Sequence, residues 1–546
     1  MSDTDVGLYK QILRAHHDGH FKQAQKLQEK ITNHILDGYI LYDRYFSPRY
    51  KTKASEITAW FDGYADLAVA SDMYDLGRQK KATLPPRKPK GLFGGQAGTC
   101  SAVFRPEPID LIRGKTFSYL GSKDSSQAKS IMNKIYKNLK KGHTKTVRKL
   151  LENPQTKKLF SSLDYDQAQT ALSFSYFIDG ENTRAIEFIR PVLERSGKHI
   201  PQAFWVAGLT AWRQGDFSTS AKYFDAAATH QKGYPLLEAS ASVWAARSYL
   251  KIGAFEKVRP ALERAAQYQR LFYGILAMRI LAKDLGHVWD TPAKPDDDLS
   301  AEFSHPAMER FYALHQIGQK EWAGKELSKL YLEADDEAKG ILLMISEQNG
   351  FSDDLLAVSG NLGDGSTRYP APNWTPTDGW KVDKALVYAF VRQESCFNRR
   401  AESDMGAVGL MQIMPATGRE LAKNLQYPFQ KKLLKDPEYN LSLGQNYLLT
   451  LMQKQAVGDN LMYMATAYNA GPGNLIKWKK QINTNDPLLF LESIPSKETR
   501  SFVERIIVNY WIYRNLMNQP LASLDSVATG DWPCYRPIDC PIKQSK

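Results

Sequence analysis

The sequence predicts an all-α protein in which an α-superhelix of helical hairpins precedes a smaller helical domain. A glycine followed five residues later by a small or β-branched residue recurs along the first two thirds of the chain. In the last third, apolar residues repeat with the spacing of one helix face. The proline-rich stretch 369–376 separates the two regions. Because proline cannot continue a helix, we expect a boundary there.

The glycine units indicate helix pairs. They begin at Gly19, Gly142, Gly180, Gly215, Gly253 and Gly318. From the second to the fifth, the intervals are 38, 35 and 38 residues, which is close to the period of tetratricopeptide-like helix pairs. The two most similar units run from Trp205 to Phe224 and from Trp244 to Leu262. One pair cannot bury its apolar face alone, so we expect neighbours to stack; an irregular helical domain with coincidental glycines is the alternative.

These patterns divide the chain of 546 residues into five stretches. We expect an N-terminal helical segment (1–84), a Pro/Gly-rich loop (85–108), the superhelical domain (109–368, with a linker segment near 270–368), a Pro-rich linker (369–380) and the C-terminal helical domain (381–546). The loop lacks the Lys-Ser/Thr of a phosphate-binding loop, so we assign it no chemistry.

The chain is basic, with 72 Lys and Arg against 59 Asp and Glu and a net charge of +13. This balance favours an acidic partner such as nucleic acid, a membrane surface or an anionic polymer, or it only aids solubility. We expect no nucleic acid, since none of the usual binding motifs is present. A basic run from Lys134 to Lys149 fits either contact with an acidic strand or a solvated helix face.

One acidic residue ends an apolar helical stripe. Val387, Phe390 and Val391 precede Glu394 by seven, four and three residues, which is one face of a helix. Burial disfavours the ionised carboxyl and raises its pKa, and a carboxyl that stays protonated near neutral pH can act as a general acid. An ordinary glutamate near a helix end, paired or solvated, is the alternative.

Four motifs then follow in order: RQES (392–395), GLMQIMP (409–415), AYNAGPG (467–473) and KETR (497–500). In this order and at these spacings they resemble the soluble lytic transglycosylases, family 1A, over roughly the last third of the chain. The resemblance implies a ring- or U-shaped superhelix followed by a catalytic domain with the lysozyme-like (goose-type) fold. It also implies that Glu394 lies at the bottom of a groove.

The resemblance further implies the reaction. Most glycosidases need two carboxylates, but the sequence forces no second acid near Glu394, because Glu402 and Asp404 lie in a loop of unknown direction. The family uses one glutamate twice. It protonates the bond between N-acetylmuramic acid and N-acetylglucosamine and then accepts the proton of the muramoyl C6 hydroxyl, which attacks C1 and leaves a 1,6-anhydro end. The substrate's own N-acetyl group stabilises the cationic sugar, and no water is consumed.

Matching positions imply the substrate contacts. These are Ser403, Gln412, Met414, Tyr468, Asn469, Glu498 and Tyr510, with Tyr513 as an alternative to the last. Met414 as plain core, and Glu498 as an acid that only favours the start of the last long helix, are alternatives. Arg399 and Arg400 stand where the family usually has proline, and we expect them to bind carboxylates of the stem peptides.

The resemblance implies a periplasmic monomer that acts on peptidoglycan strands with stem peptides, with other cell-wall enzymes as further partners. The N-terminus itself shows no signal peptide and reads as cytoplasmic. No cofactor or metal is expected, because the four cysteines are scattered and have no histidine at ligand spacing. Cys534 and Cys540 fit a small disulfide loop or two free thiols. The rival functions are a muramidase on the same fold and a non-catalytic helical-repeat scaffold.

Overall fold

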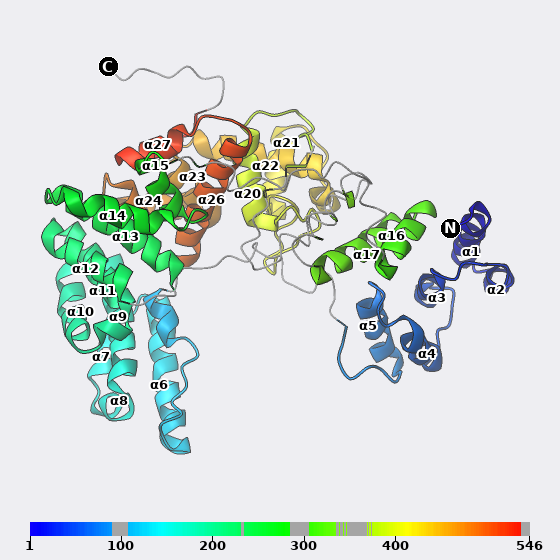
Figure 1. Ribbon diagram of the computed structural model, residues 1–546, viewed down its shortest axis with the longest axis horizontal. Helices are drawn as coiled ribbons and strands as arrows, with labels where there is room; N and C mark the ends of the chain where they lie inside the picture. Colours follow the sequence, from blue (N-terminus) through cyan, green and yellow to red (C-terminus); the bar gives the residue numbers. More distant parts are fainter. Residues whose placement is uncertain are drawn as a thin grey trace. The chain divides into compact units, whose positions relative to one another are not determined.

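The computed structural model describes residues 1–89, 107–230, 234–283, 305–334 and 374–536, with eight isolated residues between these stretches (285, 338, 342, 345, 346, 369, 371 and 372). Across the described residues the regular structure is helical (Figure 1), and β-structure is confined to isolated bridges. The all-α prediction is therefore confirmed. Most of the predicted Pro/Gly-rich loop, residues 90–106, lies outside the described residues.

The chain forms two compact units, each assembled from separate stretches. The first unit comprises Met1–Ala102, Asp290–Gly379 and Glu394–Leu443, and the second comprises Val103–Trp289, Trp380–Gln393 and Gly444–Lys546. Within the described part of the chain, no helix combines the length and apolar character needed to cross a bilayer.

Consecutive helices of the second unit pack as hairpins. They are α6 (Ser122–Lys140), α7 (Thr144–Glu152), α8 (Pro154–Leu159), α9 (Ser162–Ile178), α10 (Asn182–Ser196), α11 (Pro201–Arg213), α12 (Phe217–Thr229), α13 (Pro235–Lys251), α14 (Phe255–Ala266) and α15 (Phe272–Ile280), preceded by the short 3-10 helix η1 (Pro108–Ile112). All six glycines singled out in the sequence lie between two helices with φ between 71° and 84°. This left-handed backbone ends one helix and frees the chain to begin the next, so the helix-pair prediction is confirmed.

Aromatic side chains join successive hairpins. Trp205 of α11, Phe224 of α12 and Trp244 of α13 form one cluster, in which the Phe224 ring centroid lies 5.4 Å from each tryptophan. All three are buried. Stacked pairs therefore bury the faces that a single pair leaves exposed.

The same hairpins hold the C-terminal helices α25 (Pro487–Ser493), α26 (Lys497–Leu516) and α27 (Ala522–Thr529). Asp486, which caps α25, accepts hydrogen bonds from Trp212 Nε1 (3.1 Å) and Arg247 Nη2 (2.8 Å). The buried Tyr273 hydroxyl donates to Glu492 Oε1 at 2.6 Å. Because these contacts are directional and partly or fully buried, they fix α25 on the superhelix.

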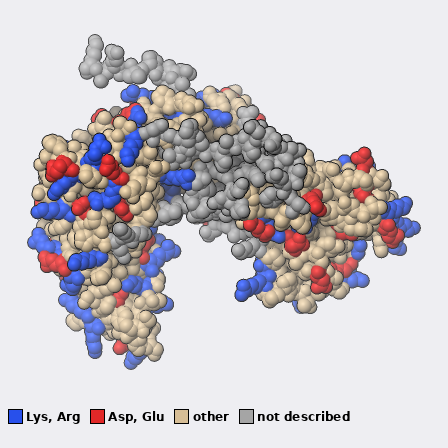
Figure 2. Space-filling view, viewed as in Figure 1, with Lys and Arg blue, Asp and Glu red and all other residues tan. Residues whose placement is uncertain are grey.

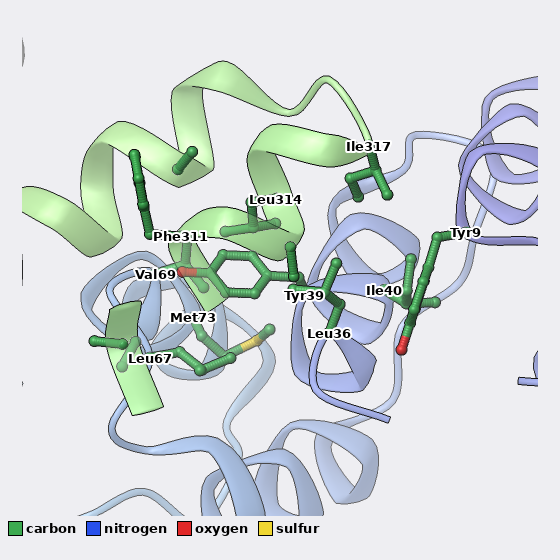
Figure 3. Packing of buried hydrophobic residues seen from close by; sticks show 14 of the residues in the cluster. Tyr9, Leu36, Tyr39, Ile40, Leu67, Val69, Met73, Phe311, Leu314 and Ile317 are labelled. Atoms are coloured by element: carbon green, nitrogen blue, oxygen red, sulfur yellow. The ribbon is translucent and has the colours of Figure 1, made fainter. Parts of the chain in front are cut away.

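The first unit brings the N-terminal helices against a pair more than 200 residues later. The N-terminal helices are α1 (Asp3–Asp18), α2 (Phe21–Gln28), α3 (Asp37–Phe46), α4 (Ala54–Tyr64) and α5 (Ala70–Lys80), and the later pair is α16 (Pro306–Gln316) and α17 (Lys320–Glu333). Figure 3 shows their shared core, in which Tyr39 and Met73 lie beside Phe311 and Leu314. At its edge the buried Glu326 carboxylate accepts from the Tyr39 hydroxyl (2.5 Å) and the Ala68 amide (3.1 Å).

We expect Tyr39→Phe to lower the free energy of unfolding of this unit by about 1.5–3 kcal/mol, the usual contribution of a hydrogen bond to a charged group. Thermal and urea unfolding measure the change. Tyr74→Phe is the matched control, because Tyr74 packs on Phe61 in the same core and its hydroxyl has no hydrogen bond to another described residue. Equal losses in the two variants would show that the Glu326 bond contributes nothing.

Candidate active site

The predicted acid lies at the end of helix α20 (Lys384–Ser395). Val387, Phe390 and Val391 are fully buried, and Glu394 on the same face is partly exposed. The apolar stripe is therefore a core face, and its last turn brings a carboxyl to the edge of the core.

Side-chain hydrogen bonds fix α20 at both ends. At its start, the Asp383 carboxylate accepts from Arg514 Nη1 (3.2 Å) and Gln519 Nε2 (3.3 Å). Near its end, Arg505 Nε donates to Gln393 Oε1 at 2.6 Å. Since the residue next to Glu394 is tied to α26, the backbone that carries the acid has little freedom.

The backbone around Glu394 is strained. Cys396 and Phe397, directly after α20, have φ of 53° and 64°, and Gln412 has φ of 44°. Bulky residues rarely adopt positive φ, and such strain gathers at functional sites. Cys396 is disulfide-bonded, whereas Cys534 is a free thiol. The small disulfide loop considered for the C-terminal cysteines is therefore not formed, and Cys540 lies outside the described residues.

Three of the predicted substrate-contact residues, Ser403, Gln412 and Met414, lie on the loop that follows α20. Ser403 Oγ accepts from the Ala407 amide at 3.0 Å and stabilises a turn. The Gln412 side-chain nitrogen donates to the Gly409 carbonyl at 2.9 Å, so the amide oxygen is the end that can face a ligand. Met414 is 42% exposed, so it is not the plain core residue considered as an alternative.

Asn440 is a positioning residue that the sequence did not reveal. It lies fully buried on α22 (Pro437–Met452). Its amide nitrogen donates to the carbonyls of Val408 (3.1 Å) and Leu434 (2.8 Å), and its oxygen accepts from the Met411 amide (2.9 Å). One side chain thus holds both ends of the turn at Gly409. Nothing in the sequence distinguishes this asparagine from a surface one.

We expect Gly409→Ala to disrupt this turn. Gly409 has φ of 82°, and a Cβ there would lie 2.0 Å from the Leu434 carbonyl oxygen. Gly406 is the matched control, because its φ of 85° is close to that of Gly409 but no atom outside its chain neighbours lies within 4 Å of its Cβ position. Alanine at Gly406 should cost about 1–2 kcal/mol, and alanine at Gly409 distinctly more, with a lower cleavage rate per folded molecule. Equal melting temperatures and rates for the two variants would contradict this.

Two further predicted substrate-contact residues, Tyr468 and Asn469, lie in the last turn of helix α23 (Leu461–Ala470) in the second unit. The Tyr468 ring packs on Phe390 of α20 (centroids 4.6 Å apart) and on Tyr447 (5.3 Å). Phe390 lies one turn before Glu394 on the same face of α20. Asn469 Oδ1 accepts from the Thr499 hydroxyl at 2.7 Å. Within the second unit, packing thus places the AYNAGPG motif against Phe390 of α20, and the Asn469 hydrogen bond links it to KETR.

The KETR motif forms the first turn of α26, and it is anchored from a distant part of the chain. The guanidinium of Arg500, which is 4% exposed, makes a bidentate pair with the buried Glu107 carboxylate (2.7 Å to each oxygen). Lys497 Nζ pairs with Asp110 Oδ2 at 2.5 Å. Between these anchors Glu498 is exposed. The sequence revealed Glu498 but not the two acids that hold its neighbours.

Tyr510 and Tyr513 differ from the other predicted contacts. Both are fully buried, with exposures of 1% and 0%. The Tyr510 hydroxyl accepts from Arg514 Nη1 at 2.6 Å, and burial raises the pKa of Tyr510 well above its usual range. These rings belong to the core around α20, so we do not carry them into the substrate contacts.

Glu402, the other acid considered near Glu394, is exposed and paired with Lys431 Nζ (2.5 Å) and Lys435 Nζ (3.4 Å). The hydrogen bond and charge of Lys431 lower the pKa of Glu402. A carboxyl held ionised cannot protonate a leaving group at neutral pH. In the described residues, no group of three or more His, Cys, Asp and Glu side chains is placed to hold a metal ion.

Residues 375–490 match a family model described as the transglycosylase SLT domain. A soluble lytic murein transglycosylase of Escherichia coli (strain K12) is 30% identical over 300 residues, which cover 53% of this chain and 45% of the relative. A putative soluble lytic murein transglycosylase of Haemophilus influenzae is 36% identical over 140 residues, 25% of this chain and 23% of the relative. The chain spans about half the length, or less, of these curated relatives.

Solved structures share the fold over nearly the whole chain. The 70-kDa soluble lytic transglycosylase of Escherichia coli matches with a TM-score of 0.66 at 18% identity, over 95% of this chain and 98% of that one. An inactive mutant of the lytic transglycosylase Slt of Pseudomonas aeruginosa matches with a TM-score of 0.60 at 17% identity, over 94% and 97%. The predicted fold class is thereby confirmed.

Proposed function

We propose that this chain is a soluble lytic murein transglycosylase that cleaves peptidoglycan without consuming water. Its SLT domain match and its relatives support this proposal, and its fold agrees with it. The bond cut is the one between N-acetylmuramic acid and N-acetylglucosamine, and the new end is a 1,6-anhydro sugar. One observation carries the proposal: Glu394 ends the buried face of a helix that is fixed at both ends, inside the matched SLT segment.

In this proposal Glu394 acts twice. It first donates its proton to the glycosidic oxygen, and as a carboxylate it then accepts the proton of the C6 hydroxyl, which attacks C1. The second carboxylate of a two-carboxylate mechanism acts as a base or nucleophile. Both oxygens of Glu402 are paired with lysines, Oε1 with Lys431 and Oε2 with Lys435, which supports a route that uses Glu394 alone. The acetamido group of the substrate takes the part of the second carboxylate.

Side chains of the loop after α20 and of the AYNAGPG and KETR motifs supply the proposed substrate contacts. The Gln412 amide oxygen suits the N–H of an acetamido group, since the amide nitrogen is already bound within the loop. The exposed thioether of Met414 suits an apolar sugar face. Ser403, Tyr468, Asn469 and Glu498 complete the proposed set. We further propose that the helical superhelix holds or threads the strand.

We propose the periplasm as the compartment, with peptidoglycan strands and their stem peptides as the substrate and other cell-wall enzymes as further partners. The disulfide bond of Cys396 supports this compartment, because disulfides persist where the surroundings are oxidising.

A reducing-end assay on purified peptidoglycan tests the proposal. We expect soluble fragments to accumulate without new reducing ends, since the anhydro end cannot be reduced by borohydride. A muramidase on the same fold would yield one reducing end for each bond cut. A helical-repeat scaffold would release nothing from the substrate while binding it.

Arg399 and Arg400, on the loop after α20, give a further prediction. Replacing both by alanine should weaken binding of peptide-bearing strands, by up to about ten-fold for two charge contacts near the surface, and should leave binding of naked glycan unchanged. Co-sedimentation with the two substrates measures this. Equal loss on both would rule out a contact with stem-peptide carboxylates.

A further inference from the structure

Helices α6, α7 and α8 carry most of the chain's excess charge. The segment 122–159 holds eleven Lys and Arg against Asp124 and Glu152, a net charge of +9 out of +13 for the whole chain. The basic residues are Lys123, Lys129, Lys134, Lys137, Lys140, Lys141, Lys145, Arg148, Lys149, Lys157 and Lys158. We call their side chains the basic face.

The charge of the basic face is exposed and largely unneutralised. All eleven side chains are exposed, and among the described residues only Arg148 forms an ion pair, with Glu152 at 3.3 Å. The three helices form one end of the second unit, opposite α15 and α27 in Figure 1, and Lys and Arg atoms gather at that end in Figure 2. Like charges at this density repel one another and destabilise the compact state. A bound anion would relieve this repulsion, so the surface is suited to an anionic ligand.

The chemistry of the face argues against an inserted membrane helix and against a single-stranded nucleic acid. A helix that binds a membrane inserts an apolar face, but the apolar side chains Met132, Ile135 and Leu139 of α6 are buried inside the unit. Single-stranded nucleic acid stacks on exposed aromatic rings. The one aromatic residue of α6–α8, Tyr136, is partly buried, with Lys140 Nζ 5.8 Å from its ring centroid. The face offers charge alone, which suits a hydrated polymer with spaced anionic groups.

We propose that the basic face binds the stem-peptide carboxylates of the glycan strand, as a second contact distant in sequence from the SLT domain. The proposal rests on the proposed function, which supplies a substrate with a carboxylate-bearing peptide on each repeat. The α6 helix rises about 1.5 Å per residue, so its lysines extend over about 25 Å and can meet several stems. Each exposed contact is weak, but contacts along one strand add through effective concentration.

A binding measurement tests this proposal. The whole chain is used, and it carries Glu394→Gln so that the strand is not cleaved. The face variant carries Lys134→Gln, Lys137→Gln, Lys141→Gln and Lys145→Gln. The control carries Lys10→Gln, Lys22→Gln, Lys26→Gln and Lys30→Gln, which are equally exposed, lie in the N-terminal helical region and change the net charge by the same amount. Circular dichroism and melting temperature confirm that both variants fold.

Three probes separate the sources of negative charge: peptidoglycan with its stems, glycan freed of stems by an amidase, and phosphatidylglycerol vesicles. We expect the face variant to bind stem-bearing peptidoglycan about ten-fold more weakly than the parent at low salt, and the control to bind within two-fold of the parent. Both should bind stem-free glycan alike. Added salt should weaken the parent's binding to stem-bearing strands, since surface charges are screened.

Other outcomes overturn the proposal. Equal losses in the face and control variants would mean a net-charge effect. A loss confined to vesicles would mean a membrane surface instead, and a loss on stem-free glycan as large as on stem-bearing strands would mean that the stems are not the ligand. The same lysine substitutions, made in the chain that keeps Glu394, distinguish a failure of the basic-face proposal from a failure of the proposed function. Unchanged cleavage with unchanged binding removes only the basic face, whereas a parent that does not cleave at all removes the proposed function.

Discussion

Glu394→Gln should lower the rate of peptidoglycan cleavage by about a thousand-fold or more. Glutamine has nearly the same shape, so the buried face of α20 and the bond between Gln393 and Arg505 remain. It can neither give a proton to the leaving oxygen nor take one from the C6 hydroxyl. General acid–base groups contribute about 10²–10⁴-fold each, and here one group performs both steps. Release of soluble muropeptides, followed over time by chromatography, measures the loss.

Glu402→Gln is the matched control for this prediction, since it removes an acid eight residues away on the exposed loop. Glu402 pairs only with surface lysines among the described residues, so we expect its rate to stay within about three-fold of the parent. If Glu402→Gln instead reduced cleavage as strongly as Glu394→Gln, a two-carboxylate mechanism would replace the single-acid route. An active Glu394→Gln protein would remove Glu394 from the chemistry altogether.

Glu107→Gln should lower the free energy of unfolding of the second unit by about 3–5 kcal/mol, the usual result of removing one partner of a buried ion pair. Glu107 and Arg500 are 7% and 4% exposed, and the guanidinium makes three contacts of 2.7–3.0 Å with the carboxylate. Glutamine would leave the Arg500 charge buried without its counter-ion. Urea unfolding followed by tryptophan fluorescence measures the change.

Asp110→Asn is the control for the second prediction. Its partner Lys497 lies three residues before Arg500, but the pair is exposed by about a third (32% and 29%), so we expect a loss of less than about 1 kcal/mol. Replacing Glu107 and Arg500 together by Leu and Met should be less costly than Glu107→Gln alone, because no charge is then left unpaired. Comparable losses for Glu107→Gln and Asp110→Asn would contradict the assignment.

The Glu107–Arg500 ion pair should also influence substrate binding. Arg500 follows Thr499, whose hydroxyl holds Asn469, and the exposed Glu498 precedes both. At a temperature where Glu107→Gln remains folded, we expect KM to rise more than kcat falls, because the proposed contacts Asn469 and Glu498 bind sugar without taking part in proton transfer.

The parts of the fold that follow from short-range pattern could be read from the sequence. The glycines at Gly180, Gly215 and Gly253 mark hairpin turns because a left-handed residue is needed there whatever the rest of the chain does. The stripe before Glu394 predicts a buried face because its spacing matches the helix period. Both arguments use fewer than ten neighbouring residues.

The parts that depend on distant contacts could not be read in this way. Glu107 meets Arg500 across 393 positions, and Tyr39 meets Glu326 across 287. No periodicity reports which surfaces of separate helices will meet. Asn440 is similar, since only the folded loop shows that three backbone groups converge on its amide.

Tyr510 shows where residue spacing leaves the direction of a side chain open. Tyr510 lies on a helix with apolar residues on most sides, and spacing alone does not distinguish a ring that faces a groove from one that faces the core. In the structure, the hydrogen bond from Arg514 and an exposure of 1% show that this ring faces the interior.

Mass spectrometry of the muropeptides released from purified peptidoglycan by the full chain tests the central claim most directly. The proposed mechanism predicts products lighter by one water molecule than the hydrolysed disaccharide peptides, each with an anhydro end, and no such products from Glu394→Gln. Products with ordinary reducing ends, formed at a rate that depends on Glu394, would contradict the water-free mechanism and identify the protein as a muramidase.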